Sequence, residues 1–133
     1  MKKMNWQLIL VLKVGHLMNS IEQGTIVFID FEPSRGSEIT KRRPAVVISR
    51  DEYSYSSNLI IVCPITSTKK NRPYFVDIKH EKLASGSRVN TKQVYTLDYS
   101  EQGGRKIDIL GKVSQREFIN IAQHFLMNFN FQL

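Results

Sequence analysis

The stretch QGTIVFIDFEPSRGSEITKRRPAVVIS, residues 23–49, contains the pattern that predicts the fold. Its first apolar run, TIVFIDF at 25–31, is rich in β-branched and aromatic residues and stops at Pro33, so we expect a strand there. A second run, PAVVISR at 44–50, predicts another strand that begins at Pro44, where the missing N–H does least harm. Two short strands joined by a polar segment are typical of an antiparallel β domain.

Further short strands follow along the chain. The segment LIIVCPIT (59–66) is a nearly continuous apolar run, and Pro64 within it predicts that strand pairing stops or bulges there. The segments YFVDIK (74–79) and SRVNTKQVYTLD (87–98) supply more strands, whereas the polar residues 51–58 predict a loop.

The C-terminal segment is predicted to be helical. Ser114 followed by Glu117 is a capping box. Apolar residues then recur at helical spacing, namely Phe118, Ile121, Ala122, Phe125 and Phe129. Short strands in series followed by one amphipathic helix predict a mainly β fold, a small and strongly bent antiparallel barrel with the helix packed against it.

Length, charge and cysteine content narrow the class of protein. The chain of 133 residues is long enough for one domain and too short for two. Lys and Arg outnumber Asp and Glu by 19 to 12, a net charge of +7, which favours a polyanionic partner such as nucleic acid or an acidic peptide. The single cysteine, Cys63, lies in an apolar run and predicts a buried thiol in a reducing compartment, the cytoplasm.

No sequence motif for a metal or a cofactor is visible. The histidines His16, His80 and His124 are scattered, without spaced Cys, His or Asp partners, so we expect neither a metal site nor a cofactor. There is no Gly-rich phosphate loop before a helix and no G-x-S-x-G motif. An enzyme with this sequence would use arginine, hydroxyl groups and a carboxylate rather than a histidine acid–base pair.

Residues 1–23 differ from the rest of the chain. They begin with basic residues and an apolar run, like the front of a signal peptide, but the run is short and Lys13 interrupts it. A membrane span needs about 20 apolar residues, so none is predicted. Met18 is a natural start for a compact β domain, which leaves open that the residues before it are not translated. We therefore interpret residues 1–23 as an N-terminal extension, of which residues 1–17 are dispensable, and residues 24–133 as the functional domain.

An arginine and a threonine are the candidate chemical groups. Arg43 precedes Pro44, which holds its backbone extended, and Thr66 follows the disruption at Pro64. If the two strands pair, both side chains reach one rim of the barrel. A guanidinium fork that matches phosphate oxygens and a rotatable hydroxyl together suit a pentacovalent phosphorane. On spacing alone, a solvated or salt-bridged Arg43 is the commoner alternative.

The stretch 23–49, followed after one loop by IIVCPITS (60–67), resembles the MazF/PemK/Kid family of toxin endoribonucleases. The match consists of a strand ending in Pro, then GSE, then Arg-Pro before an apolar strand, then Pro-x-Thr-Ser. Order and spacing hold from Gly24 to about Asp98. The resemblance implies an SH3-like barrel of the CcdB/MazF/PemK type, a homodimer, and metal-independent, sequence-specific cleavage of single-stranded mRNA to 2′,3′-cyclic phosphate and 5′-OH ends.

The resemblance also implies residue roles and a partner. Arg43 and Thr66 match the catalytic arginine and threonine of the family. The predicted substrate-binding residues are Ser37, Glu38, Ser67, Lys69 and Gln93. The excess of positive charge is expected to form a groove along the RNA backbone, made by Lys41, Arg42, Lys69, Lys70 and Arg72. A cognate MazE-like antitoxin with an acidic C-terminal tail would occupy that groove.

The chain also departs from the family pattern. Ser54 follows Tyr53 where many members have asparagine, EQGGRKI (101–107) replaces an Arg-Leu pair, and Asn90 and Lys92 stand where one branch has a catalytic Arg and Asp. The base preference of the family therefore cannot be carried over. Two other functions stay open: a CcdB-like toxin that poisons gyrase without catalysis, and a non-catalytic, RNA-binding SH3-like module.

Overall fold

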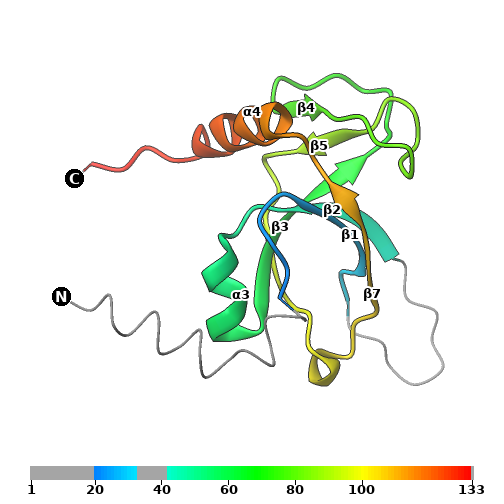
Figure 1. Cartoon of the computed structure of the whole chain (residues 1–133). Helices are drawn as coiled ribbons and strands as arrows, with labels where there is room; N and C mark the ends of the chain where they lie inside the picture. The colour runs from blue at the N-terminus through cyan, green and yellow to red at the C-terminus, as the bar shows by residue number, and fades with distance from the viewer. Residues whose placement is uncertain (1–19, 33–41, 133) are drawn as a thin grey trace.

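The computed structural model describes residues 20–32 and 42–132, which form short strands and two helices (Figure 1). In chain order the elements are β1 (Thr25–Asp30), β2 (Arg42–Val47), α3 (Asp51–Ser57), β3 (Leu59–Thr66), β4 (Phe75–Asp77), β5 (Arg88–Asn90), β6 (Tyr95–Asp98), the 3₁₀ turn η1 (Glu101–Gly103), β7 (Ile107–Lys112) and α4 (Gln115–Leu126).

β3 is the central strand, and it changes neighbours along its length. All pairs are antiparallel in the order β4–β5–β3–β2–β1–β7, with β6 also paired to β3. The first part of β3 pairs with β2 and β6, and from Ile65 onward it pairs with β5. Pro64 is the last β3 residue paired with β2, so the prediction that pairing stops at this proline is confirmed.

The prediction of a mainly β, antiparallel fold with a C-terminal helix is confirmed. However, no pairing among the described residues joins β6 to β7, so the strands form a curved, open sheet rather than a closed barrel (Figure 1). The turn η1 separates these two edges. Arg105 bridges the gap with side-chain hydrogen bonds to the carbonyl oxygens of Asp98 (3.3 Å) and Phe31 (3.4 Å).

Apolar side chains fill both faces of the sheet. The α3-side core consists of the buried residues Ile21, Val27, Ile29, Ala45, Val47, Ile60, Val62 and Leu97. The α4-side core consists of the buried residues Ile26, Val46, Cys63, Ile65, Val76, Ile78, Val89 and Ile121. Because successive side chains of a strand point to opposite faces, neighbours such as Val46 and Val47 belong to different cores.

The helix α4 begins at the predicted capping box. The Ser114 hydroxyl accepts a hydrogen bond from the Glu117 N–H (3.1 Å), and Glu117 Oε1 accepts one from the Ser114 N–H (2.8 Å). Ile121 is fully buried, and Phe125 packs against the same core. Glu117 Oε2 also accepts a hydrogen bond from the Lys79 N–H (2.8 Å), which ties the helix to the segment after β4.

Residues 51–58 are largely helical, so the prediction of a polar loop was wrong. Asp51 and Glu52 lie in the first turn, where negative charge favours a helix, and Asn58 ends the helix in the left-handed conformation (φ 59°). Ser54 is buried against the sheet. Within the described part of the chain, no helix has the length and apolar character needed to cross a bilayer.

Candidate active site

The ends of β2 and β3 lie next to each other where their pairing stops. β2 begins at Arg42, two residues earlier than predicted, so Arg43 lies within the strand. Ala45 and Pro64 form the last β2–β3 pair. When this register is continued by two residues, toward the start of β2 and the end of β3, Arg43 comes opposite Thr66. The alternation of side chains puts both on the face of the α3-side core.

The side chain of Arg43 is exposed and lies over an aromatic ring. Its Cζ atom is 5.9 Å from the ring centroid of Phe31. Phe31 in turn packs edge to face on Tyr95, with 4.7 Å between ring centroids and an interplanar angle of 61°. Among the described residues, no hydrogen bond or ion pair engages the guanidinium of Arg43. This part of the protein therefore leaves its N–H donors unsatisfied.

Thr66 ends β3 and is half-buried. Its Oγ1 accepts a hydrogen bond from the Thr68 N–H (3.2 Å). This contact fixes the hydroxyl oxygen and leaves its proton free to be donated elsewhere. The next residue, Ser67, is exposed.

Gln93 approaches the same end of the sheet from the other side of β3. The last β3–β6 pair is Val62 with Tyr95. When this register is continued by two residues, Gln93 comes opposite Pro64. Gln93 is exposed. The register therefore places an arginine, a threonine and a glutamine, each from a different chain segment, around the proline at which β3 changes neighbours.

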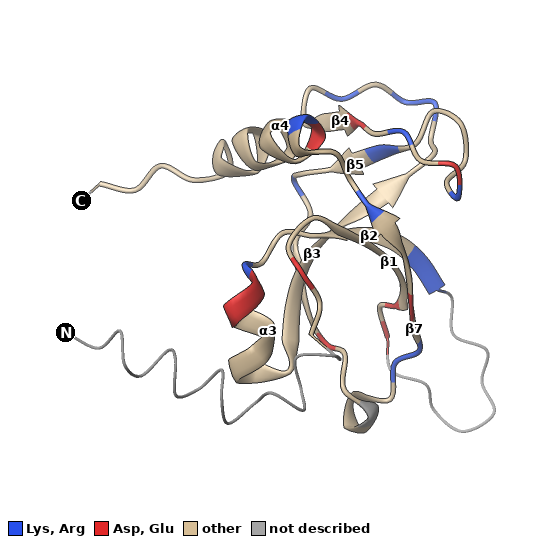
Figure 2. Ribbon diagram, in the orientation of Figure 1, with Lys and Arg blue, Asp and Glu red and all other residues tan. Residues whose placement is uncertain are grey.

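The loop between β3 and β4 carries the expected positive charge. Lys69, Lys70 and Arg72 are all exposed. Figure 2 shows basic residues along this loop and at the start of β2. The charge that the composition predicted for a polyanionic partner therefore flanks the ends of β2 and β3.

Arg88 on β5 anchors this loop, and sequence analysis did not identify it. One guanidinium nitrogen donates to the carbonyl oxygens of Thr68 (2.7 Å) and Lys70, and the other donates to Asn71 Oδ1 (2.9 Å). The guanidinium also lies 4.9 Å from the ring centroid of Phe75. No local signal marks this role, because it depends on β5 pairing with the end of β3.

Three predicted residues, Ser37, Glu38 and Lys41, lie outside the described residues. Arg42 points to the face opposite Arg43, where it donates to Asp108 Oδ2 (2.5 Å) and the Phe28 carbonyl oxygen (2.9 Å) and covers the Phe28 ring (4.7 Å). Its charge is paired with Asp108 on that face, and its expected place along the RNA backbone stays a prediction.

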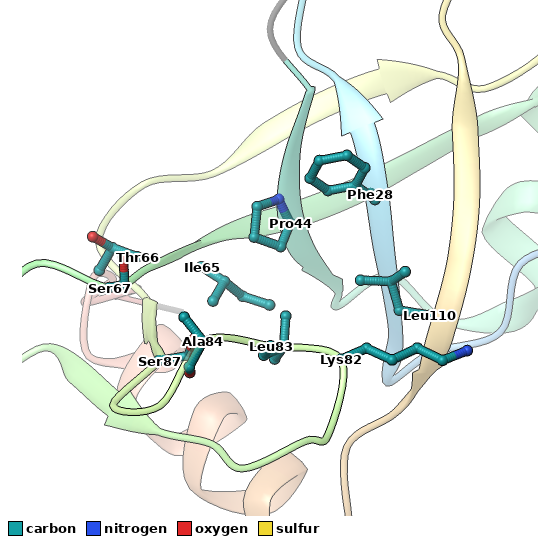
Figure 3. Close-up of a pocket in the computed structure, with 10 residues that line it drawn as sticks. All are labelled: Phe28, Pro44, Ile65, Thr66, Ser67, Lys82, Leu83, Ala84, Ser87 and Leu110. Carbon is teal, nitrogen blue, oxygen red and sulfur yellow. Dashed lines mark hydrogen bonds between the residues drawn. The ribbon is translucent and has the colours of Figure 1, made fainter.

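A pocket of about 190 Å³ opens beside Thr66 and Ser67 (Figure 3). Most of its lining is apolar, with hydroxyl groups and one lysine at the edges. The lining residues are Phe28, Pro44, Ile65, Thr66, Ser67, Lys82, Leu83, Ala84, Ser87 and Leu110. Ile65 belongs to the α4-side core, against which Leu83 and Leu110 pack, so the pocket is an open extension of that core.

Cys63 is not a candidate nucleophile. It is fully buried, as predicted, and burial raises the pKa of its thiol to about 12. The thiol is therefore protonated and unreactive at neutral pH. In residues 20–32 and 42–132, no cluster of three or more His, Cys, Asp or Glu side chains is arranged to hold a metal ion.

The fold and this edge define a class of protein: a small antiparallel β domain with a basic edge on which arginine, threonine and glutamine side chains lie close in register. Residues 22–128 match the family described as PemK-like, MazF-like toxin of type II toxin-antitoxin system. The chain therefore belongs to this toxin family, and the resemblance seen in the sequence is confirmed.

Individual relatives agree with this assignment. The chain is 34% identical over 85 residues to endoribonuclease toxin MazF of Escherichia coli K12, covering 64% of this chain and 75% of that protein. It is 28% identical over 108 residues to endoribonuclease MazF9 of Mycobacterium tuberculosis H37Rv, covering 77% of this chain and 91% of that protein.

Solved structures show the same fold. MazF from Deinococcus radiodurans superposes with a TM-score of 0.67 at 25% identity, covering 82% of this chain and 96% of that one. A MazE-MazF structure from the same organism gives a TM-score of 0.67 at 24% identity, covering 82% of this chain and 95% of that one.

Proposed function

We propose that this toxin is a sequence-specific endoribonuclease that cleaves single-stranded mRNA without a metal ion, and that Arg43 and Thr66 carry the chemistry. The observation behind the assignment is the β2–β3 register, which puts both side chains at matching positions on one face. Both sequence relatives named above are described as endoribonucleases. The alternatives of a gyrase poison and a non-catalytic RNA-binding module receive no comparable support.

The proposed reaction is attack of a ribose 2′-oxygen on the adjacent phosphorus, which breaks the bond between phosphorus and the 5′-oxygen. The 2′-hydroxyl releases a proton and the departing 5′-oxygen gains one, so the products are a 2′,3′-cyclic phosphate and a 5′-OH. Arg43 neutralises the charge that builds on the phosphorane, and its planar fork orients the phosphate. It does not act as a base, because a guanidinium does not deprotonate in proteins.

Thr66 complements the arginine as a neutral donor. Since its oxygen already accepts the Thr68 N–H, its proton is directed elsewhere and can bond to a phosphorane oxygen or the leaving oxygen. Ser67, Lys69 and Gln93 then hold the strand on either side of the scissile bond. Their exposure at the same end of the sheet supports this role.

The partner of a type II toxin is an antitoxin, and we propose that its acidic tail competes with RNA for the basic edge. The proposal rests on the family and on the exposed charge of the loop between β3 and β4. A disordered acidic segment would lose conformational entropy on binding and gain charge pairs. Because these charges are exposed, added salt should weaken the complex. In the same scheme the toxin is a cytoplasmic homodimer.

The test is a cleavage assay in EDTA with sequencing of the new 5′ ends. Arg43→Ala and Thr66→Ala should each lower the cleavage rate by about 100-fold or more, because removing one preorganised donor to a developing anion has an effect of that size. Both residues lie at the edge, so the melting temperature should change little. Arg116→Ala, which removes an exposed charge on α4, is the matched control.

Three results would count against the proposal. A folded Arg43→Ala or Thr66→Ala protein that cleaves like wild type removes that residue from the mechanism. Products with 5′-phosphate ends, or activity that requires magnesium, contradict attack by the 2′-hydroxyl.

A further inference from the structure

Two aromatic rings lie beside Arg43 without a role in the chemistry proposed above. Phe31 follows β1 and Tyr95 begins β6, and both are half-buried. Both pack against the α3-side core, and their rings meet edge to face with 4.7 Å between centroids. The packing fixes the two rings relative to each other, because each contacts both the core and the other ring.

The pair lies on the same face as the candidate catalytic groups. Tyr95 is opposite Val62, which belongs to the α3-side core, and Arg43 belongs to that face by strand alternation. The guanidinium of Arg43 lies over the ring of Phe31, 5.9 Å from its centroid. A flat group stacked on either ring would therefore lie next to the arginine that we assign to the scissile phosphate.

We propose that Tyr95, with Phe31 packed edge to face against it, forms a stacking platform for one nucleobase next to the scissile phosphate. The inference rests on the proposed function and names a binding subsite within it. Aromatic rings bind unpaired bases through their π faces, and stacking by itself tolerates any base. The exposed Gln93, two residues before Tyr95 on the same face, offers an amide for the edge of a stacked base.

The surroundings favour a nucleobase over an apolar side chain. An apolar peptide group would gain little from the neighbouring Arg43 guanidinium, whereas a nucleotide brings a phosphate that this cation can bind. The Tyr95 hydroxyl has no hydrogen-bond partner within the described residues, so it can also donate to or accept from a base edge.

The experiment measures binding rather than cleavage, so it does not depend on the catalytic assignment. The probes are three fluorescent 12-mers of equal charge, 2′-fluoro oligo(A), 2′-fluoro oligo(U) and an abasic strand, none of which carries the attacking hydroxyl. Wild type should bind the better of the two base-carrying strands about tenfold more tightly than the abasic strand. Tyr95→Leu should lose most of that difference, whereas Tyr95→Phe, which keeps the ring, should retain it.

Two controls separate stacking from loss of structure. Tyr53→Leu removes a ring from α3, away from the β2–β3 edge, and should bind all three probes like wild type. The melting temperature of Tyr95→Leu should remain within a few degrees of wild type, because leucine still packs on the core; Phe31→Leu serves as the second variant if it does not.

The outcomes distinguish the platform from the proposed function. If both folded leucine variants bind the base-carrying strands more tightly than the abasic strand by as much as wild type does, the platform is overturned. Base-dependent binding that requires Tyr95, in a protein that cleaves no RNA, supports the platform and contradicts the endoribonuclease assignment. Cleavage by a protein whose binding does not depend on the bases supports the endoribonuclease assignment and overturns the platform.

Discussion

The role of Arg88 leads to a prediction about both stability and substrate binding. Replacing it with lysine keeps the positive charge but removes the fork that spans Thr68, Lys70 and Asn71. A single ammonium nitrogen cannot occupy the positions of the two guanidinium nitrogens that make these contacts, nor can it offer a planar group to the Phe75 ring, whose centroid is 4.9 Å from the guanidinium carbon. Arg88→Lys therefore tests geometry separately from charge.

The size of the effect follows from these contacts. The bond to Thr68 is partly buried and charge-assisted, which is worth about 1.5 kcal/mol. The two more exposed bonds add roughly 0.5 kcal/mol each, and contact with the ring adds about 0.5 kcal/mol. We expect Arg88→Lys to lose about 2 kcal/mol of unfolding free energy and Arg88→Ala about 3 kcal/mol. For a domain of this size that corresponds to a fall in Tm of about 6–10 °C.

The activity should change in a characteristic way. The loop that Arg88 holds carries Ser67 and Lys69, which we assign to substrate binding, so KM should rise several-fold while kcat changes less. Urea unfolding and steady-state cleavage of a fluorogenic RNA give both quantities. Arg116→Lys, the same replacement at an exposed position on α4, is the control. An Arg88→Lys protein with wild-type Tm and KM would refute the reasoning.

Two further predictions concern the core and the N-terminus. Because the Cys63 thiol ionises near its ordinary pKa of 9.0 in the unfolded chain but only near 12 when folded, stability is intact below pH 9 and falls as the pH rises toward 12. From pH 8 to 10, wild type should lose ~1.4 kcal/mol more unfolding free energy than Cys63→Ala, measured in urea, and parallel curves would contradict this. For the N-terminus, we propose that the domain begins near Met18, because the family match starts at residue 22 and Ile21 is already packed in the core. Expression from Met18 should leave Tm and cleavage unchanged, and a fall in either would show that residues 1–17 contribute.

The sequence determined the features that depend on near neighbours. Alternating and continuous apolar runs predicted most of the strands because burial of one face requires that spacing, and the Ser114–Glu117 box predicted where α4 begins because its two hydrogen bonds are local. The prolines next to Arg43 and before Thr66 made both residues candidates before any strand order was known, and the family resemblance implied their catalytic roles. The helix α3 was missed because its serine- and tyrosine-rich sequence has low helix propensity. The helix is stabilised instead by tertiary contacts, namely the burial of Ser54 and the hydrogen bond that Tyr99 donates to the Ser54 carbonyl oxygen (3.2 Å).

The tertiary structure alone decided which distant residues share the edge. β2 stops pairing with β3 at Pro64, and on its other edge β3 passes from β6 to β5, which brings Arg88 to the basic loop. The pairing of β6 with β3 brings Tyr95 and Gln93 to the face of Arg43, and the same pairing allows Phe31, 64 residues away, to contact Tyr95. Strand pairing is non-local, and the hydrogen bonds of a ladder do not depend on side-chain identity. A single sequence therefore specifies each strand and the face it buries, but the neighbour that each strand selects is decided by the packing of both cores together.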